Sequence, residues 1–74
     1  MNREPVESSN VVSVGYDPAG TKLDVEFKGG AVYRYYRVPP IVHREMLKAK
    51  SKGGFLSENV KGFFDYLRDP KGNI

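Results

Sequence analysis

Apolar and polar side chains alternate most cleanly in KLDVEFK, residues 22–28. Leu23, Val25 and Phe27 would lie on one face of a β-strand, and the lysines and carboxylates between them on the other. Such alternation is typical of a strand that is buried on one face and solvated on the other. The segment therefore predicts a half-buried strand.

Two neighbouring segments are also typical of strands. NVVSVGY, residues 10–16, is rich in β-branched residues and would place Val12, Val14 and Tyr16 on one side. AVYRYYRV, residues 31–38, supplies another strand, which a pair of prolines ends. The turn sequence DPAGT and a Gly-Gly pair separate these segments from the central one. The pattern predicts a three-stranded antiparallel meander.

In chain order the three strands are residues 10–16, 22–28 and 31–38. The loop between the second and third decides which face the tyrosines of the third strand occupy, because a shift of one residue moves every side chain to the other face. A two-residue turn at Gly29–Gly30 would pair Phe27 with Val32 and place those tyrosines among carboxylates. A three-residue loop, residues 28–30, would pair Phe27 with Ala31 and place them on the apolar face. We favour the longer loop, because it gathers the most apolar surface on one side.

This register assigns Tyr33 and Tyr35 to the core. It sends three other side chains of the strand outward: Val32, Arg34 and Tyr36. Arg34 would then lie near Glu26 on the solvated face, where an ion pair between strands is mildly favourable.

The second half of the chain predicts helices. After two prolines, IVHREMLKAK, residues 41–50, places Val42, Met46 and Ala49 on one helical stripe. FLSENVKGFFDYLRD, residues 55–69, also has a helical period, which Gly62 interrupts.

The second helix either continues through that glycine or stops near Lys61 and leaves FFDYLR extended. The expected fold is α+β, with one or two helices packed on one face of the meander. We expect a flexible arm at residues 1–8 and a flexible tail at residues 69–74.

A chain of 74 residues predicts a single domain, residues 1–74. It has no cysteine and one histidine, His43, which excludes disulfides, thiolate zinc sites and sites with several histidines. No apolar run approaches the roughly 20 residues that span a bilayer, and the N-terminus lacks the apolar segment of a signal peptide. We expect a cytoplasmic protein with no metal, no cofactor and no membrane partner.

Charge is distributed unevenly along the chain. The net charge is +3, but residues 1–28 carry three basic and five acidic side chains, whereas residues 29–74 carry nine basic and four acidic ones. A one-sided basic distribution favours an anionic partner, although it is also compatible with an ordinary soluble surface.

Three stretches of the chain resemble the KTSC domain, a short bacterial module that also occurs at the C-terminus of some lysyl-tRNA synthetases. They are VESSNVVSVGYD, then LDVEFKGGAVYRYYRVP, then LKAKSKGGFLSENV. The family's recurring positions match six residues here, for which we expect structural roles: Tyr33, Tyr35, Pro39, Ser51, Phe55 and Asn59. The resemblance covers roughly residues 5–67 and implies no established activity. RNA binding has been suggested for the family because of the synthetase attachment.

The first candidate site is the solvated face of the third strand, with Arg34, Tyr36 and Arg37. An exposed ring beside guanidinium groups can stack a base and bind its phosphate. Asp24 and Glu26 would share this face and repel a phosphate backbone, so an ordinary charged sheet surface is the alternative.

The second candidate is LKAKSKGG, where Lys48, Lys50 and Lys52 precede Gly53 and Gly54. A glycine corner that leads into a helix beginning near Phe55 would offer backbone N–H groups to an anion. The alternative is a glycine-capped helix corner with solvated lysines. The spacing of a Walker loop is absent.

Hydroxyl and amide side chains fit structural roles better than catalysis. Ser57 would cap a helix, and Asn59 would bond the backbone of the third strand. No nucleophile, base and orienting group assemble, so we expect no enzyme activity. The favoured function is RNA or other nucleic-acid binding through a basic surface. The alternatives are a protein partner or self-association through sheet edges, and binding of small nucleotide-like anions.

Overall fold

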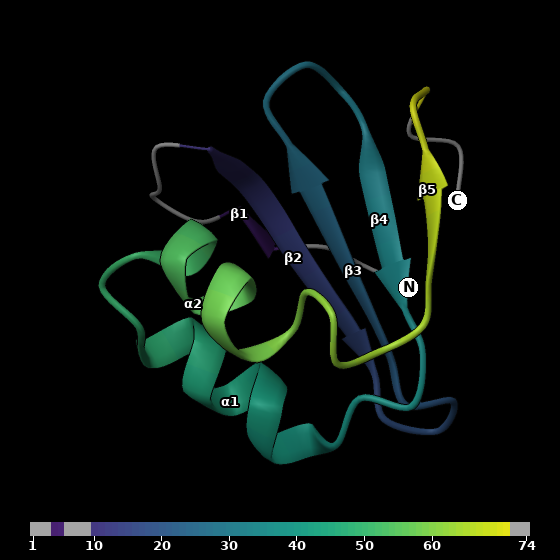
Figure 1. The fold of residues 1–74 in the computed structure, drawn as a ribbon, viewed down its shortest axis with the longest axis vertical. Helices are drawn as coiled ribbons and strands as arrows, with labels where there is room; N and C mark the ends of the chain where they lie inside the picture. Colours follow the sequence, from purple (N-terminus) through teal and green to yellow (C-terminus); the bar gives the residue numbers. More distant parts are fainter. Residues whose placement is uncertain (1–3, 6–9, 72–74) are drawn as a thin grey trace.

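The computed structural model describes residues 4–5 and 10–71, which form an antiparallel sheet with two helices on one face (Figure 1). The strands and helices follow in this order: β1 (Glu4–Pro5), β2 (Val11–Asp17), β3 (Lys22–Phe27), β4 (Val32–Tyr35), α1 (Pro40–Lys48), α2 (Lys52–Asn59) and β5 (Tyr66–Asp69). The spatial order of the sheet is β1-β2-β3-β4-β5. The predicted α+β class and the central meander are confirmed.

Two strands extend the predicted meander. β1 pairs with β2 and lies within the predicted N-terminal arm, whose other residues are outside the described part of the chain. β5 pairs with β4, so residues 66–69 of the segment after Gly62 are extended and belong to the sheet. Gly62 has a φ of +83°, a conformation that continues no right-handed helix, and it turns the chain from the helical layer back to the sheet. The prediction of three strands was therefore wrong in number, and residues 72–74 of the predicted tail are not described.

The β3–β4 hairpin has the favoured three-residue loop. The Phe27 N–H donates to the Ala31 carbonyl at 2.9 Å, and the Gly30 N–H donates to the Phe27 carbonyl at 3.1 Å. Gly29 and Gly30 have φ values of +101° and +97°, which residues other than glycine rarely adopt. Val25 is opposite Tyr33, so the tyrosines of β4 face the helices as predicted.

A register shift between Val11 and Ser13 changes the predicted face of β2. Such a bulge adds one unpaired residue and reverses the alternation beyond it. Val11 and Val14 consequently both face the core, and Val12 is exposed. The prediction that Val12 shares a side with Val14 was wrong.

One hydrophobic core joins the sheet to both helices. Its fully buried members are Val11, Val14, Leu23, Val25, Tyr35, Val38, Met46, Leu56 and Val60. Met46 comes from α1 and Leu56 from α2, and each closes the sheet face where the apolar residues of β3 and β4 point.

The opposite face of the sheet carries a buried ion pair. The Arg34 Nε and Nη2 groups donate to the two carboxylate oxygens of Asp24 at 2.8 and 2.9 Å. The predicted partner, Glu26, instead accepts from the Ser13 hydroxyl at 2.8 Å. Val32 also points to this face but is buried, which corrects its assignment to solvent.

The two helices meet at a corner that Ser51 caps. α1 begins at Pro40, and the missing N–H of a proline costs nothing in the first turn of a helix. Just beyond the C-terminal end of α1, the Lys52 ammonium donates to the Ala49 carbonyl at 2.6 Å. α2 begins at Lys52, because the Ser51 hydroxyl accepts from the Gly54 N–H at 3.0 Å.

Three predictions for this region were wrong. Gly53 and Gly54 lie inside the first turn of α2, not before it. Ser57 is a helix-interior residue and not the cap, and the Asn59 amide donates to the Phe55 carbonyl of its own helix at 3.2 Å, not to a strand.

Candidate nucleic-acid interface

The predicted basic surface of residues 34–52 does not form as one surface. Arg34 lies on the sheet face opposite the helices, and its hydrogen bonds to Asp24 raise the pKa of the guanidinium and neutralise its charge locally. Lys48, at the end of α1, belongs to the helical layer on the other side of the sheet. The prediction of a single patch was wrong, because the sheet lies between the face that carries Arg34 and the helices that carry the lysines.

The other residues of the first candidate site follow β4 in a loop. Tyr36 is half-buried, and its N–H donates to the Asp65 carbonyl at 2.9 Å. Arg37 is exposed and has a φ of +60°. Of the three predicted side chains, only Arg37 presents its charge fully to solvent.

The lysine corner also differs from its prediction. Lys48 and Lys50 are exposed, but the ammonium group of Lys52 is held by the Ala49 carbonyl. The N–H of Gly54 is already bonded to Ser51. Two of the donors that an anion would have used are therefore satisfied within the chain.

A different site lies between the helical layer and the β3–β5 part of the sheet. Tyr33 is its central ring: it contacts Phe27 edge-on at 5.2 Å and stacks with Tyr35 at 6.2 Å and Tyr66 at 5.6 Å, all between ring centroids. Tyr66 is 59% exposed. These four rings, from three adjacent strands, form what we call the aromatic cleft.

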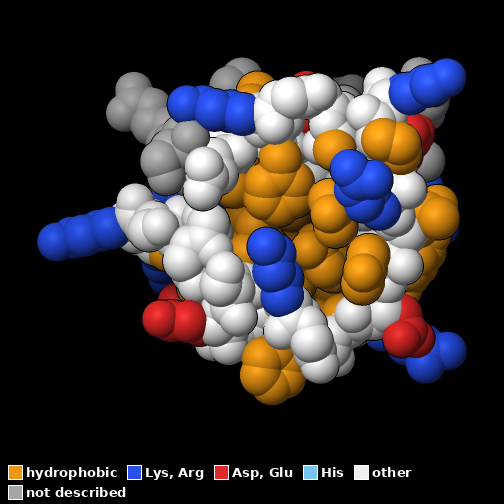
Figure 2. Space-filling view, turned by 45° about the horizontal axis from the view of Figure 1, so that its top comes forward, with side chains coloured by type: hydrophobic (Ala, Val, Ile, Leu, Met, Phe, Trp, Pro, Cys, Tyr) orange, Lys and Arg blue, Asp and Glu red, His pale blue; other side chains and the backbone are white. Residues whose placement is uncertain are grey.

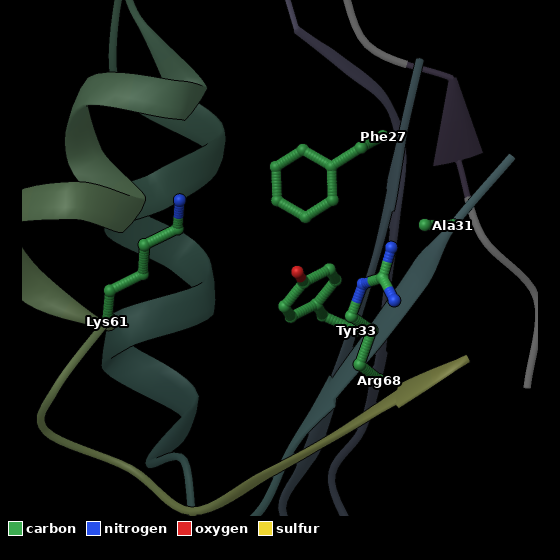
Figure 3. Close-up of a pocket in the computed structure, with 5 residues that line it drawn as sticks. All are labelled: Phe27, Ala31, Tyr33, Lys61 and Arg68. Carbon is green, nitrogen blue, oxygen red and sulfur yellow. The ribbon is translucent and has the colours of Figure 1, made fainter. Parts of the chain in front are cut away.

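Two cations stand over this cleft. The Lys61 ammonium lies 5.7 Å from the centroid of Phe27, and the Arg68 guanidinium carbon lies 5.9 Å from the centroid of Tyr33. Figure 3 shows Lys61 reaching from the helical side and Arg68 from β5, with the Phe27 and Tyr33 rings between them. Cations at such distances are attracted to the ring faces, and both side chains are solvent-exposed.

Three adjoining hollows open at the cleft. One, of about 180 Å³, is lined by Phe27, Ala31, Tyr33, Lys61 and Arg68. A second, of about 430 Å³, is lined by Tyr33, Tyr35, Lys61, Gly62 and Tyr66. A third, of about 280 Å³, is lined by Asn10, Phe27, Lys28, Gly53, Ser57 and Lys61.

Lys61 lines all three hollows, and among the residues that the structure describes no aspartate or glutamate lines any of them. Figure 2 shows a face of the molecule on which hydrophobic side chains lie among lysine and arginine side chains, with acidic groups only toward its edges. Apolar ring surfaces beside the positive charges of Lys61 and Arg68 suit a ligand that is both flat and anionic.

Burial is deepest at Tyr35, which forms the floor of the cleft. Its desolvation, together with the neighbouring Tyr33 and Tyr66, raises the pKa of the Tyr35 phenol to about 12. The Tyr35 phenol therefore stays uncharged at neutral pH.

Sequence reasoning assigned no functional role to Phe27, Lys61, Tyr66 or Arg68. Tyr66 and Arg68 enter the cleft only because β5 pairs with β4, with Tyr35 opposite Tyr66 and Tyr33 opposite Arg68. The available signal was the sequence YLRD after the break at Gly62, whose residues also fit an edge strand.

Within the described part of the chain, no helix is long and apolar enough to cross a membrane. The same residues contain no group of three or more histidine, cysteine, aspartate or glutamate side chains that could hold a metal ion.

Comparisons with known proteins place this geometry in a family. Residues 7–64 match the family model of the KTSC domain. A protein of Tsukamurella paurometabola is 49% identical over 61 residues, which cover 82% of this chain and 91% of that protein. A lysine–tRNA ligase of a Nostoc species is 37% identical over 60 residues, which cover 81% of this chain and 11% of the ligase.

A crystal structure of a KTSC domain protein from Yersinia pestis has the same fold. It superposes with a TM-score of 0.88 at 37% sequence identity and covers 92% of this chain and 96% of that one. The family description names a domain and no reaction. With a family match over residues 7–64 and a structural counterpart that covers 92% of its length, this chain belongs to the KTSC domain family.

Proposed function

We propose that this domain is a non-catalytic module that binds single-stranded RNA, with bases against the aromatic cleft and phosphates near Lys61 and Arg68. The observation that carries the proposal is the contact of two exposed cations with a cluster of four rings. A base has a flat π-face for the rings, and its phosphate is an anion for the cations. Stacking of a base on an aromatic side chain contributes about 1–3 kcal/mol.

The shape of the site favours a single strand over a duplex. The rings line hollows instead of standing on a flat surface, so a base must leave its own stack to reach them. Bases in loops and single strands are free to do so, and proteins read RNA sequence mostly in such regions. The similarity to a segment of lysine–tRNA ligases supports RNA as the polymer, because those enzymes act on an RNA.

Salt dependence tests the role of the cations. If Lys61 and Arg68 each neutralise one phosphate, the affinity for a short oligouridine should fall about sevenfold between 50 and 200 mM salt. Replacing both with glutamine should weaken binding and flatten that dependence. Arg44→Gln, which removes one exposed charge from α1 outside the three hollows, should change affinity far less.

A matched pair of ring deletions tests the role of the cleft. Tyr66 is 59% exposed and lines a hollow, whereas Phe63 is 68% exposed and lines none of the three. Tyr66→Ala should weaken oligouridine binding by about fivefold or more, the loss of one stacking contact, and Phe63→Ala should leave it unchanged. Equal effects of the two deletions, or no saturable binding by the parent, would refute the proposal.

A second function is favoured by the outer edge of β5. It is the last strand of the described sheet; Leu67 within it and Phe63, three residues before its start, are exposed. Such an edge can accept a strand from another chain. A mass that rises with protein concentration and resists nuclease treatment would support this protein-binding mode instead.

A further inference from the structure

The third hollow beside the aromatic cleft, of about 280 Å³, has several polar lining residues, and we call it the polar hollow. The inference drawn from it rests on the proposed function and deepens it. We propose that this hollow is a phosphate subsite, so that the unit recognised is one base together with its adjoining phosphate. It is lined by Asn10, Phe27, Lys28, Gly53, Ser57 and Lys61.

The subsite is continuous with the cleft. Phe27 and Lys61 line both the polar hollow and the aromatic hollow that contains Tyr33. A ligand that stacks at Phe27 and Tyr33 therefore has its next group directed to a space of about 280 Å³ with a polar wall. Each hollow alone is smaller than a typical ligand pocket, and the two together fall within the usual range of ligand-pocket volumes.

Two lysines approach the hollow from different elements. Lys28 is exposed in the β3–β4 loop, and its backbone N–H donates to the Asn10 carbonyl at 2.9 Å, which fixes the loop against the start of β2. Lys61 follows α2. Asn10 and Ser57 add an amide and a hydroxyl, and within residues 4–5 and 10–71 no carboxylate lines the space. Such a lining is suited to a phosphate oxygen.

Gly53 leaves this hollow open, and the fold itself does not need a glycine at this position. It lies in the first turn of α2, where glycine is a weak helix former, and it has an ordinary helical backbone. Among the described residues, a Cβ added there would meet only the Asn10 amide nitrogen, at 3.8 Å, which is normal contact distance. Gly54 differs, because a Cβ at that position would lie 3.1 Å from the Ser51 hydroxyl of the cap. The missing side chain at Gly53 leaves space in the hollow and does nothing evident for the helix.

Because a side chain at position 53 would enter the hollow without disturbing α2, a substitution there separates an effect on binding from an effect on folding. Gly53→Glu puts a carboxylate into the hollow, while an acidic residue in the first turn of a helix is favourable to the helix. The urea midpoint of unfolding should therefore stay the same or rise. Lys28→Gln is an independent variant in an exposed loop, and Arg44→Gln is the matched charge control on α1.

The probes are the dinucleotide UpU and its analogue with an uncharged methylphosphonate linkage, titrated by amide chemical shifts. The parent and Arg44→Gln should bind UpU about tenfold or more tightly than the neutral analogue, the effect of a hydrogen-bonded charged contact. Gly53→Glu and Lys28→Gln should reduce that preference to within about twofold, and the shifts of the parent should include Lys28, Gly53 and Ser57. Uridine 3′- and 5′-monophosphates added in parallel show whether the phosphate is a terminal or an internal one.

Equal binding of UpU and its neutral analogue by the parent would overturn the phosphate subsite and leave base binding in place. An undiminished preference in both Gly53→Glu and Lys28→Gln would also overturn it. Absence of binding by every probe and by oligouridine would refute the proposed function together with the subsite.

Discussion

Replacing Arg34 with methionine should lower the free energy of unfolding strongly. The sequence predicted Arg34 as a nucleic-acid contact, but the structure gives it a stabilising role. Asp24 is only 1% exposed, and both of its carboxylate oxygens accept from the Arg34 guanidinium at 2.8 and 2.9 Å. Arg34→Met would leave that carboxylate buried without its partner. Breaking a buried pair in this way typically costs about 3–5 kcal/mol.

The cost should be unequal between the two partners. The Arg34 side chain is 23% exposed, so after Asp24→Val its guanidinium can turn toward water and the loss of stability should be smaller. The double variant Asp24→Val/Arg34→Met removes both charges and should lie within about 1 kcal/mol of the parent, because an apolar pair of similar volume often replaces a buried ion pair without loss. A domain of 74 residues has roughly 4–11 kcal/mol of total stability, so these differences are easily measured.

The assay is urea unfolding of the parent, the two single variants and the double variant, followed by far-ultraviolet circular dichroism. The midpoint should shift while the slope with urea stays constant, since the surface exposed on unfolding is nearly the same. A loss below about 1 kcal/mol for Arg34→Met, the range of an exposed pair, would refute the reasoning. So would a costlier Asp24→Val. Oligouridine affinity of the folded double variant should match the parent, because Arg34 lies on the other face from the aromatic cleft.

Three further predictions concern the tyrosine floor, the helix cap and a strained turn. Because burial raises the pKa of Tyr35 from 10 to about 12, its neutral phenol stabilises the fold fully below about pH 10, and about 2–3 kcal/mol should be lost as the pH rises to 12. Tyr35→Phe should lose less stability over that interval, and an identical alkaline profile would contradict the assignment. Ser51→Ala removes the acceptor for the Gly54 N–H and should cost about 1 kcal/mol in urea unfolding. Ser51→Asp should retain most of that stability, and an equal loss in both variants would exclude the cap. Thr21 has a φ of +51°, which is unfavourable for a β-branched residue, so Thr21→Gly should raise the free energy of unfolding by up to about 1 kcal/mol. A clear decrease would show that the turn is unstrained.

Local patterns were sufficient for the three central strands and for the face of the β4 tyrosines. The register of the β3–β4 hairpin followed from gathering apolar residues on one side, because a half-buried sheet specifies its register strongly. The same register already placed Asp24 directly opposite Arg34, so the choice of Glu26 as partner was an avoidable error. Gly53–Gly54 misled the prediction of the α2 start, because the cap at Ser51 and the burial of Leu56 outweigh the weak propensity of two glycines.

From its sequence alone this chain was determined to be a small α+β domain of the KTSC type, with a tyrosine-bearing strand turned toward its helices. Alternation and glycine placement are local properties, and they fix which way a side chain points. The neighbours of that side chain were decided only by the tertiary structure. Pairing of β5 with β4 brings Tyr66 and Arg68 to Tyr33, and the end of α2 brings Lys61 over Phe27. These contacts join segments that are distant in the chain. They depend on how the helices pack against the sheet, and no local sequence pattern encodes that packing.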